Sequence, residues 1–399
     1  MKDINLLVVT TAYPQGSSIN GIFIKNQLDA VRDRLETVSV VSPVAYFPRT
    51  ILKFASFREY SGHTEYPADY SYGNVRVYRP RYLWIWERPH TVSLREDIYF
   101  RVLERIIERK NIDFDIIHSH FIFPSSCAST RIKMRTRKPL IITAHGGEIY
   151  GIGFANVNMV DKTKKTLLSA DAIITTSPQN REIMINKLGI DEQKISIQAS
   201  GFNPDIFHPR DKLQIRKELQ LPESKRIILS IGHLLEVKGH RYLIDAMRKI
   251  AGIDEDIFCL IIGNGILKND LRKQIKDLGL GERIRLIDAV EHQDVPLWIN
   301  ASDLFVLPSL NEGSPTIVAE ALGCGKPVVA TKVGNVPFLI KEGFNGIITD
   351  VQSTNALADG IMRALQIKWD QEAISHDART RFSWPSIADD TLRVYESVM

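Results

Sequence analysis

The feature that most constrains the fold of this chain is an alternation of short apolar runs with segments of helical spacing, which occurs in two blocks. Runs that are apolar at every position form strands buried on both faces, as parallel sheets require. The segments between them, such as Asn26–Arg34 and Arg241–Ile250, carry apolar residues at helical spacing. The alternation therefore predicts two doubly wound α/β domains. The predicted strands are Ile4–Val9, Thr37–Val41, Ile116–His118, Leu140–Thr143 and Ala172–Thr176 in the first half, and Ile227–Ile231, Phe258–Ile262, Ile284–Ile287, Leu304–Leu307 and Val328–Ala330 in the second.

The chain has 399 residues, which is enough for two hydrophobic cores. The turn-rich segment Gly201–Pro222 marks the boundary, and we expect domains over residues 1–205 and 206–383. A last helix over about 384–399, with an apolar stripe at Ile387, Leu392 and Tyr395, should pack back on the first domain. The irregular region Val44–Pro89 is interpreted as an elaboration outside the core of that domain. Ligands bind beyond the carboxyl ends of strands in open α/β sheets, so a small-molecule site is expected where the two domains face one another.

Composition excludes several classes of protein. The three cysteines are far apart in apolar segments, which is typical of reduced thiols in the cytoplasm and not of a disulfide scaffold. The first apolar run is too short for a signal peptide, and no run approaches the eighteen or more apolar residues of a membrane span. The first 208 residues hold 27 Lys and Arg against 21 Asp and Glu. That excess suits an acidic substrate or peripheral contact with the inner membrane face, and it falls short of a nucleic-acid-binding composition.

The most informative stretch follows the predicted strand Leu304–Leu307. A helix should start near Pro315, because proline suits the first helical position, and end at Gly325. The free amides of Thr316, Ile317 and Val318 would then face a ligand, and helix starts of this kind hold phosphate. The neighbouring Gly313 would allow that ligand to approach closely.

Two carboxylates flank this predicted anion site, Glu312 before the helix and Glu320 within it. Carboxylates are poor phosphate ligands, but they accept hydrogen bonds from the hydroxyls of a sugar or a ribose. One anion site between two such groups is what a nucleotide sugar needs. The alternative, that Glu312 is an ordinary loop carboxylate and Glu320 a solvated helix residue, stays open on spacing alone.

The stretch resembles the Glu-x7-Glu signature of glycosyltransferase family 4, whose members are retaining enzymes with the GT-B fold. Leu307-Pro308-Ser309 before it and Gly325-Lys326-Pro327-Val328-Val329-Ala330 after it extend the match. The resemblance covers essentially the whole chain and is densest from Ile227 to Gly346. It implies that Glu312 contacts the hydroxyls of the transferred sugar and that Glu320 binds the ribose.

A second match, Ser230–His240, resembles the family motif Gly-Arg-Leu-x3-Lys-Gly, whose cations neutralise the donor diphosphate. Lys238 is the lysine of this motif, and His233 stands where the family has arginine. A histidine carries at best partial charge near neutral pH, so His233 can be functional or neutral in this position. The alternative for Lys238 is a solvated surface lysine.

In the first half, Thr143-Ala144-His145-Gly146 resembles the family's Thr-x-His-Gly segment. The resemblance places His145 beside the reacting sugar, and the alternative is a strand-end histidine bonded to backbone. His118-Ser119-His120 resembles the family's His-x-His, which could serve only to organise loops. No third ligand is evident for a metal pair there.

The site expected from these matches needs no metal and takes a nucleoside-diphosphate sugar as co-substrate. Lys238 and the helix amides would replace the cation, and the acceptor hydroxyl would attack from the front face. The resemblance makes Gly21 the candidate for the family's glycine-rich loop, where backbone amides meet the diphosphate, and the alternative is an ordinary loop glycine. The acceptor, whether a sugar, a lipid-linked glycan or a small molecule, is not identified. The expected catalytic residues are His145 and Glu312, and the expected donor-binding residues are Gly21, His233, Lys238, Gly313, Ser314, Thr316, Ile317 and Glu320.

Some features depart from the family pattern or allow other interpretations. Phe338 occupies the position of the glutamate in Gly-Gly-x-Pro-Glu. The basic run between Arg131 and Lys138 is either a solvated helix end or a lipid-headgroup site. The cluster Arg81–Arg88 is a candidate acceptor or interfacial surface. The alternative functions are a nucleotide-sugar epimerase or phosphorylase of the same fold, and a non-catalytic sugar-nucleotide-binding protein.

Overall fold

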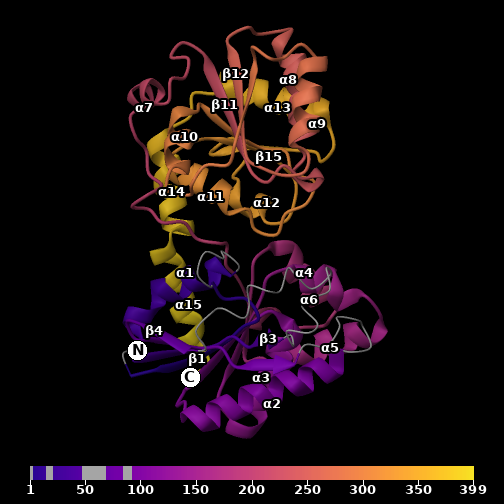
Figure 1. The fold of residues 1–399 in the computed structure, drawn as a ribbon, viewed down its shortest axis with the longest axis vertical. Helices are drawn as coiled ribbons and strands as arrows, with labels where there is room; N and C mark the ends of the chain where they lie inside the picture. Colours follow the sequence, from indigo (N-terminus) through magenta and orange to yellow (C-terminus); the bar gives the residue numbers. More distant parts are fainter. Residues whose placement is uncertain (1–2, 15–20, 47–68, 84–91) are drawn as a thin grey trace. The chain divides into compact units, whose positions relative to one another are not determined.

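The computed structural model describes residues 3–14, 21–46, 69–83 and 92–399 (Figure 1). The chain separates into two compact units, one made of residues 1–198 and 387–399 (unit 1) and the other of residues 199–386 (unit 2). Each unit is a mainly parallel sheet with helices on both faces, which confirms the predicted α/β class. Residues 199–205, expected with the first half, belong to unit 2, because Phe202 is buried in its core and pairs with Phe382 and Trp384 through backbone hydrogen bonds.

The sheet of unit 1 has eight strands in the order β10-β9-β8-β7-β1-β2-β5-β4. All neighbours run parallel except β4 and β5. All five strands predicted for this half of the chain are present. The strands are β1 (Asn5–Val9), β2 (Thr37–Val41), β4 (Asp69–Tyr72), β5 (Val75–Tyr78), β7 (Ile116–His120), β8 (Leu140–Ala144), β9 (Ala172–Thr175) and β10 (Ile195–Ile197), and a separate two-stranded sheet pairs β3 (Val44–Tyr46) with β6 (Arg81–Leu83).

The interpretation of Val44–Pro89 as lying outside the core is wrong for β5. This strand pairs with β2 along four residues, and Val75 and Val77 are fully buried. Their alternation with Arg76 is a half-buried pattern only four residues long, so the segment lacks the continuous apolar run that marks the other strands.

Helices cover both faces of this sheet. Helices α1 and α15 pack with Leu6 and Val8 on one face, whereas α2 to α6 pack with Leu7 and Val9 on the other. The predicted apolar stripe of the last helix is confirmed, since Ile387, Leu392 and Tyr395 are buried. The helices are α1 (Ile22–Val31), α2 (Val92–Lys110), α3 (Cys127–Thr136), α4 (Gly147–Tyr150), α5 (Val157–Leu168), α6 (Pro178–Asn186) and α15 (Trp384–Ser397).

The sheet of unit 2 has six strands, all parallel, in the order β13-β12-β11-β14-β15-β16. The five strands predicted for the second half are all in it. Because the strands are parallel, the loops that follow β11 and β14 leave the same edge of the sheet. The strands are β11 (Arg226–Ile231), β12 (Ile257–Ile262), β13 (Ile284–Ile287), β14 (Leu304–Leu307), β15 (Val328–Thr331) and β16 (Gly346–Thr349).

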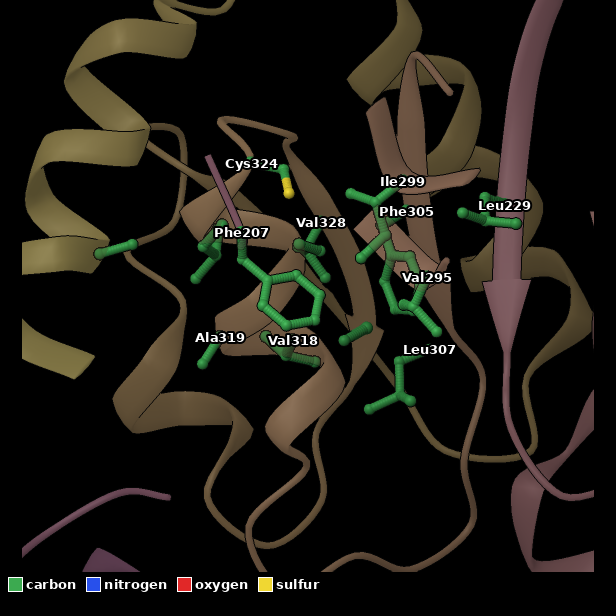
Figure 2. Close-up of a cluster of buried hydrophobic side chains, with 14 of the residues drawn as sticks. Phe207, Leu229, Val295, Ile299, Phe305, Leu307, Val318, Ala319, Cys324 and Val328 are labelled. Carbon is green, nitrogen blue, oxygen red and sulfur yellow. The ribbon is translucent and has the colours of Figure 1, made fainter. Parts of the chain in front are cut away.

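The core of unit 2 fixes the helix that follows β14. Figure 2 shows Phe305 and Leu307 of β14 in one apolar cluster with Val318 and Ala319 of α11. Helices α7, α10, α11, α12 and α14 contribute to this cluster, and α8, α9 and α13 pack on the opposite face. The helices are α7 (Lys212–Glu218), α8 (His240–Ala251), α9 (Lys268–Asp277), α10 (Val295–Ala301), α11 (Thr316–Gly323), α12 (Val336–Leu339), α13 (Thr354–Gln366) and α14 (Gln371–Phe382).

Within the described ranges, none of the helices combines the length and the apolar character that crossing a bilayer requires.

Candidate active site

The loops after the neighbouring strands β11 and β14 bring two of the predicted site residues together. Lys238 lies in a short 3-10 turn, Glu236–Lys238, after β11, and Glu312 lies in the loop between β14 and α11. The Nζ atom of Lys238 donates to Oε1 of Glu312 at 2.7 Å. The Lys238 and Glu312 side chains are 25% and 10% exposed, so the pair is largely withdrawn from solvent.

Close backbone packing holds these two loops against each other. Gly239 has a left-handed φ of 65°, and a Cβ atom on it would lie 2.0 Å from the carbonyl oxygen of Pro308. The amide of Leu310 donates to the carbonyl of Val237 at 2.7 Å. Only glycine fits at position 239, and its absence of a side chain sets the spacing of Lys238 and Glu312.

Further contacts orient the carboxylate of Glu312. Ser309 Oγ donates to the same Oε1 atom at 2.7 Å. On the backbone side, Gly334 at φ 47° packs so closely that a Cβ would be 2.1 Å from the carbonyl oxygen of Glu312. Asn335 continues this contact, since its amide donates to Gly313 O at 3.0 Å and its Nδ2 to Ser314 Oγ at 3.2 Å. The β14–α11 loop is therefore built around a fixed acidic group, and Ser309 and Asn335 were not identified from the sequence.

The start of α11 differs slightly from the prediction. The helix begins at Thr316, and Pro315 is its N-cap residue. The amide of Val318 donates to Pro315 O at 3.1 Å, so the expectation that this amide is free is wrong. In the part of the chain that the structure describes, the amides of Thr316 and Ile317 have no acceptor. These two remain the candidate anion-binding groups of the helix start.

Glu320 is buried within α11 and pairs with a residue that the sequence analysis missed. Its Oε1 lies 2.9 Å from Nε2 of His292, which is 69% exposed while the glutamate side chain is 7% exposed. The alternative that Glu320 is a solvated helix residue is therefore wrong. The hydrogen bond to Glu320 raises the pKa of His292. His292 follows β13 at the carboxyl edge of the sheet, so the rule that ligand sites lie at this edge was the signal that could have found it.

His233 lies just beyond β11 at an exposed position. Its carbonyl accepts from the amide of Leu235 at 2.8 Å, and its ring has no hydrogen bond to another described residue. The exposed position thus leaves the ring available to a ligand.

The predicted residues of unit 1 form a separate cluster of histidines at the carboxyl ends of β7 and β8. His145 follows β8, and its Nε2 lies 3.1 Å from Nδ1 of His120 at the end of β7. The rings of Phe23 and Phe121 pack against His145 at centroid distances of 4.8 and 4.6 Å. Burial lowers the pKa of His145 to about 3, so the ring is neutral near pH 7. Its ring nitrogen pairs with a side chain, unlike the alternative of a histidine bonded to backbone.

His118 has a structural role in this cluster. Its Nδ1 lies 2.8 Å from the Tyr395 hydroxyl and its Nε2 lies 2.7 Å from Thr143 Oγ1. Both nitrogens are used, and the residue connects α15 to β8. Among the described residues, no group of three or more His, Cys, Asp or Glu side chains is arranged to hold a metal ion.

Gly21 is required by the packing of its loop. It is the N-cap of α1 with φ 78°, and a Cβ would lie 2.5 Å from Ala12 O. Residues 15–20 of the same loop lie outside the described residues.

The remaining features noted in the sequence are the basic run between Arg131 and Lys138, Phe338 and the cluster Arg81–Arg88. Cations of the basic run are paired with acids of unit 1: Arg131 with Asp97, Lys133 with Asp171, Arg135 with Glu104 and Lys138 with Asp115. Phe338 packs edge-on against Phe382 with a centroid distance of 6.1 Å. Of the cluster Arg81–Arg88, residues 84–88 lie outside the described ranges.

Two α/β units with mainly parallel sheets, and an acid–lysine pair and a helix start at the carboxyl edge of the second sheet, form the arrangement expected of a GT-B glycosyltransferase. The sequence profile of "Glycosyl transferases group 1" matches residues 211–381, and that of "Glycosyltransferase Family 4" matches residues 56–206. The chain belongs to glycosyltransferase family 4, and it is an enzyme that transfers a sugar from a nucleotide-sugar donor.

The chain is also similar to individual curated proteins, and its fold is similar to that of solved structures. The chain is 28% identical to the putative teichuronic acid biosynthesis glycosyltransferase TuaC of Bacillus subtilis (strain 168), over 98% of this chain and 93% of that protein. It is 25% identical to the D-inositol 3-phosphate glycosyltransferase of Corynebacterium glutamicum (strain R), over 73% of this chain and 74% of that protein. Among solved structures, sucrose-phosphate synthase from Thermosynechococcus elongatus matches with a TM-score of 0.74 at 18% identity, covering 98% of each chain. The complex of HepE from Anabaena with UDP matches with a TM-score of 0.71 at 19% identity, covering 99% of this chain and 100% of that one.

Proposed function

We propose that the enzyme is a retaining glycosyltransferase whose donor diphosphate binds at Lys238 and the start of α11. The observation that carries this proposal is the 2.7 Å pair between Lys238 and Glu312, formed by two loops at the carboxyl edge of the unit 2 sheet. A cation and two free helix amides at the same edge of the sheet are suited to the charge that develops as a nucleoside diphosphate departs. Gly313 and Ser314 complete the loop on which that diphosphate would rest.

Glu312 and Glu320 would bind hydroxyl groups on either side of the diphosphate. Glu312 would accept from a hydroxyl of the transferred sugar, because its second oxygen, Oε2, is not occupied by Lys238 or Ser309. Glu320 would accept from the ribose hydroxyls and would then give up or share its contact with His292. His233 would contribute a hydrogen bond to the diphosphate, in the place of the arginine of other members.

His145 would act from unit 1 by donating a hydrogen bond to the transferred sugar, and Gly21 would allow the loop after β1 to approach the diphosphate. The reaction breaks the bond from the anomeric carbon to the diphosphate and forms one to the acceptor oxygen. The acceptor proton leaves on the departing phosphate oxygen. Attack on the same face that the diphosphate leaves retains the anomeric configuration, and no protein nucleophile is required.

The acceptor class that we propose is a growing cell-surface polysaccharide or its lipid-linked precursor. The support is that the relative named for teichuronic acid biosynthesis aligns with this chain over almost its whole length. A cytoplasmic location fits the three cysteines, which are free and buried.

The donor can be identified by the rise in melting temperature that a bound ligand causes, since binding only the folded state stabilises it. UDP and UDP-sugars come first, because the HepE structure contains UDP, followed by GDP- and ADP-sugars. A shift with one base and none with the others identifies the donor. If no nucleotide shifts the transition, the proposal fails.

Two substitutions then test the site itself. Lys238→Met and Glu312→Gln should each lower kcat/KM at least about tenfold, equivalent to about 1.4 kcal/mol. The matched control is Lys341→Met, which removes a lysine paired with Asp377 elsewhere in unit 2. Transfer at the normal rate in either site variant would remove that residue from the site. Retention is checked by the anomeric configuration of the first product formed, and an inverted product would refute it.

A further inference from the structure

The ring of His120 is held in a setting that restricts which nitrogen can carry its proton. The side chain is fully buried at the end of β7. Its Nδ1 lies 3.1 Å from Nε2 of His145, and its Nε2 has no hydrogen-bond partner among the described residues. The ring of His118 packs against it, tilted by 32°, at a centroid distance of 4.3 Å, but both nitrogens of His118 are engaged by Tyr395 and Thr143. Within the described ranges, the ring of His120 therefore has one hydrogen-bond partner, which is His145.

A single proton must lie between the two rings, and two arrangements are possible. If Nε2 of His145 carries the proton and donates, the proton of neutral His120 must lie on its own Nε2, as a buried N–H with no acceptor. If Nδ1 of His120 carries the proton and donates, Nε2 of His120 carries no proton and is a buried acceptor without a donor. Buried N–H groups without an acceptor are rarer than unsatisfied buried acceptors, so the second arrangement is favoured.

Both rings are neutral in this setting. Burial lowers the pKa of His120 well below its usual value, with the neighbouring histidines adding to the effect, and burial also lowers that of His145. The acid near the pair, Glu148, accepts from the backbone amide of His145 and not from its ring. The choice between the two arrangements is thus a choice between neutral tautomers.

We propose that His120 is a positioning residue that sets the tautomer of His145. Its Nδ1–H donates to Nε2 of His145, so the proton of His145 lies on Nδ1. Among the described residues, that nitrogen has no partner, and it is the one left to donate to a hydroxyl of the transferred sugar. This inference rests on the proposed role of His145 in the reaction, and it adds the residue that makes His145 a donor and not an acceptor.

The tautomer can be measured directly on the full-length enzyme without any ligand. Nitrogen-15 NMR of protein labelled only at histidine distinguishes a ring nitrogen that carries a proton from one that does not, and His145→Gln identifies the His145 signals. The expected result is a proton on Nδ1 of His145 and none on Nε2. The opposite tautomer in the wild-type enzyme would overturn the proposal, whatever the variants do.

Two variants of similar shape test the consequence at pH 8. In His120→Asn an amide N–H can replace the Nδ1–H, whereas in His120→Asp the ionised carboxylate can only accept. We expect His120→Asn to keep the His145 tautomer and to retain kcat within about threefold, and His120→Asp to move the proton to Nε2 and to lower kcat roughly tenfold or more at little change in donor KM. Activity is measured as nucleoside diphosphate release from the donor found in the ligand screen. Equal losses in both variants would make His120 a packing residue and refute the proposal.

The proposed roles of His145 and His120 can be refuted separately. If His145→Gln transfers sugar at the wild-type rate, the proposed role of His145 is wrong, even where the NMR tautomer is as expected. If His145→Gln is inactive but the wild-type tautomer is reversed, the role of His145 stands and that of His120 falls.

Discussion

Replacing Gly239 by alanine should separate the two loops that carry Lys238 and Glu312. The added Cβ would lie 2.0 Å from Pro308 O, so the two backbones must move apart by about 1 Å or more to reach an ordinary contact. The left-handed φ adds a cost of about 1 kcal/mol for any residue other than glycine, and the crowding adds about 1–3 kcal/mol. A displacement of about 1 Å at a catalytic group can cost up to roughly 100-fold in rate, so kcat/KM should fall by between tenfold and 100-fold.

Gly279→Ala is the matched control, because Gly279 has a φ of 67° and nothing lies within 4 Å of the position of its Cβ. It should lose only the backbone contribution of about 1 kcal/mol and keep its full activity. Urea unfolding gives the stability of both variants, and release of nucleoside diphosphate from the identified donor gives their activity. Equal stability in the two variants would show that the Pro308 contact is loose. Wild-type activity in Gly239→Ala would show that the spacing of the two loops does not limit the reaction.

Three further outcomes are expected. His233→Arg should lower the donor KM roughly fivefold, since a charge-assisted hydrogen bond to the diphosphate exceeds a neutral one by about 1 kcal/mol; an unchanged KM would place His233 outside the diphosphate site. Transfer activity should persist after dialysis against a strong chelator, because in the proposed site Lys238 and the α11 amides would supply the positive charge. Activity restored only by a divalent cation would contradict this. The pKa of His118 is lowered to about 3 by burial, so the unfolded chain binds its proton below about pH 6.5 and the folded protein does not. The free energy of unfolding should therefore fall, on acidification below about pH 6.5, by about 1.4 kcal/mol per pH unit for this group. In His118→Gln, the urea midpoints at pH 7.5 and pH 5.5 should differ by less than they do in the wild-type protein. If that difference is unchanged, His118 is protonated in the folded state.

Much of the fold follows from local sequence, because a strand buried on both faces needs a continuous apolar run. Strands β11 and β14 were predicted for this reason, and their parallel pairing then places the following loops at one edge. Strand β5 was not predicted as part of the core, because Val75 and Val77 alternate with polar Arg76 over only four residues. Whether such a short segment is central or peripheral depends on which strand it pairs with, and local sequence does not contain that information.

The positions of Glu312, Glu320 and Lys238 at the carboxyl edge of the unit 2 sheet could be predicted from the sequence, but their partners could not. Lys238 and Glu312 were each expected near the donor, but their direct pairing depends on a glycine packing on a carbonyl 69 residues away in sequence, from Gly239 to Pro308. His292 reaches Glu320 from a loop with no motif. The wrong expectation that the Val318 amide is free came from treating Pro315 as the first helical residue. Pro315 is instead the N-cap, and its carbonyl accepts a hydrogen bond from the Val318 amide.

The composition of the unit 1 core has a consequence for how the protein is made. Leu6 and Val8, near the beginning of the chain, share their core with Ala388, Leu392 and Tyr395 near its end. Domains usually fold in the order in which the ribosome releases them. Here the half that is synthesised first cannot complete its interior until residues 387–395 have emerged, whereas unit 2 has all its residues by position 386. In sequence order, unit 2 is therefore complete before the residues that close this face of the unit 1 core.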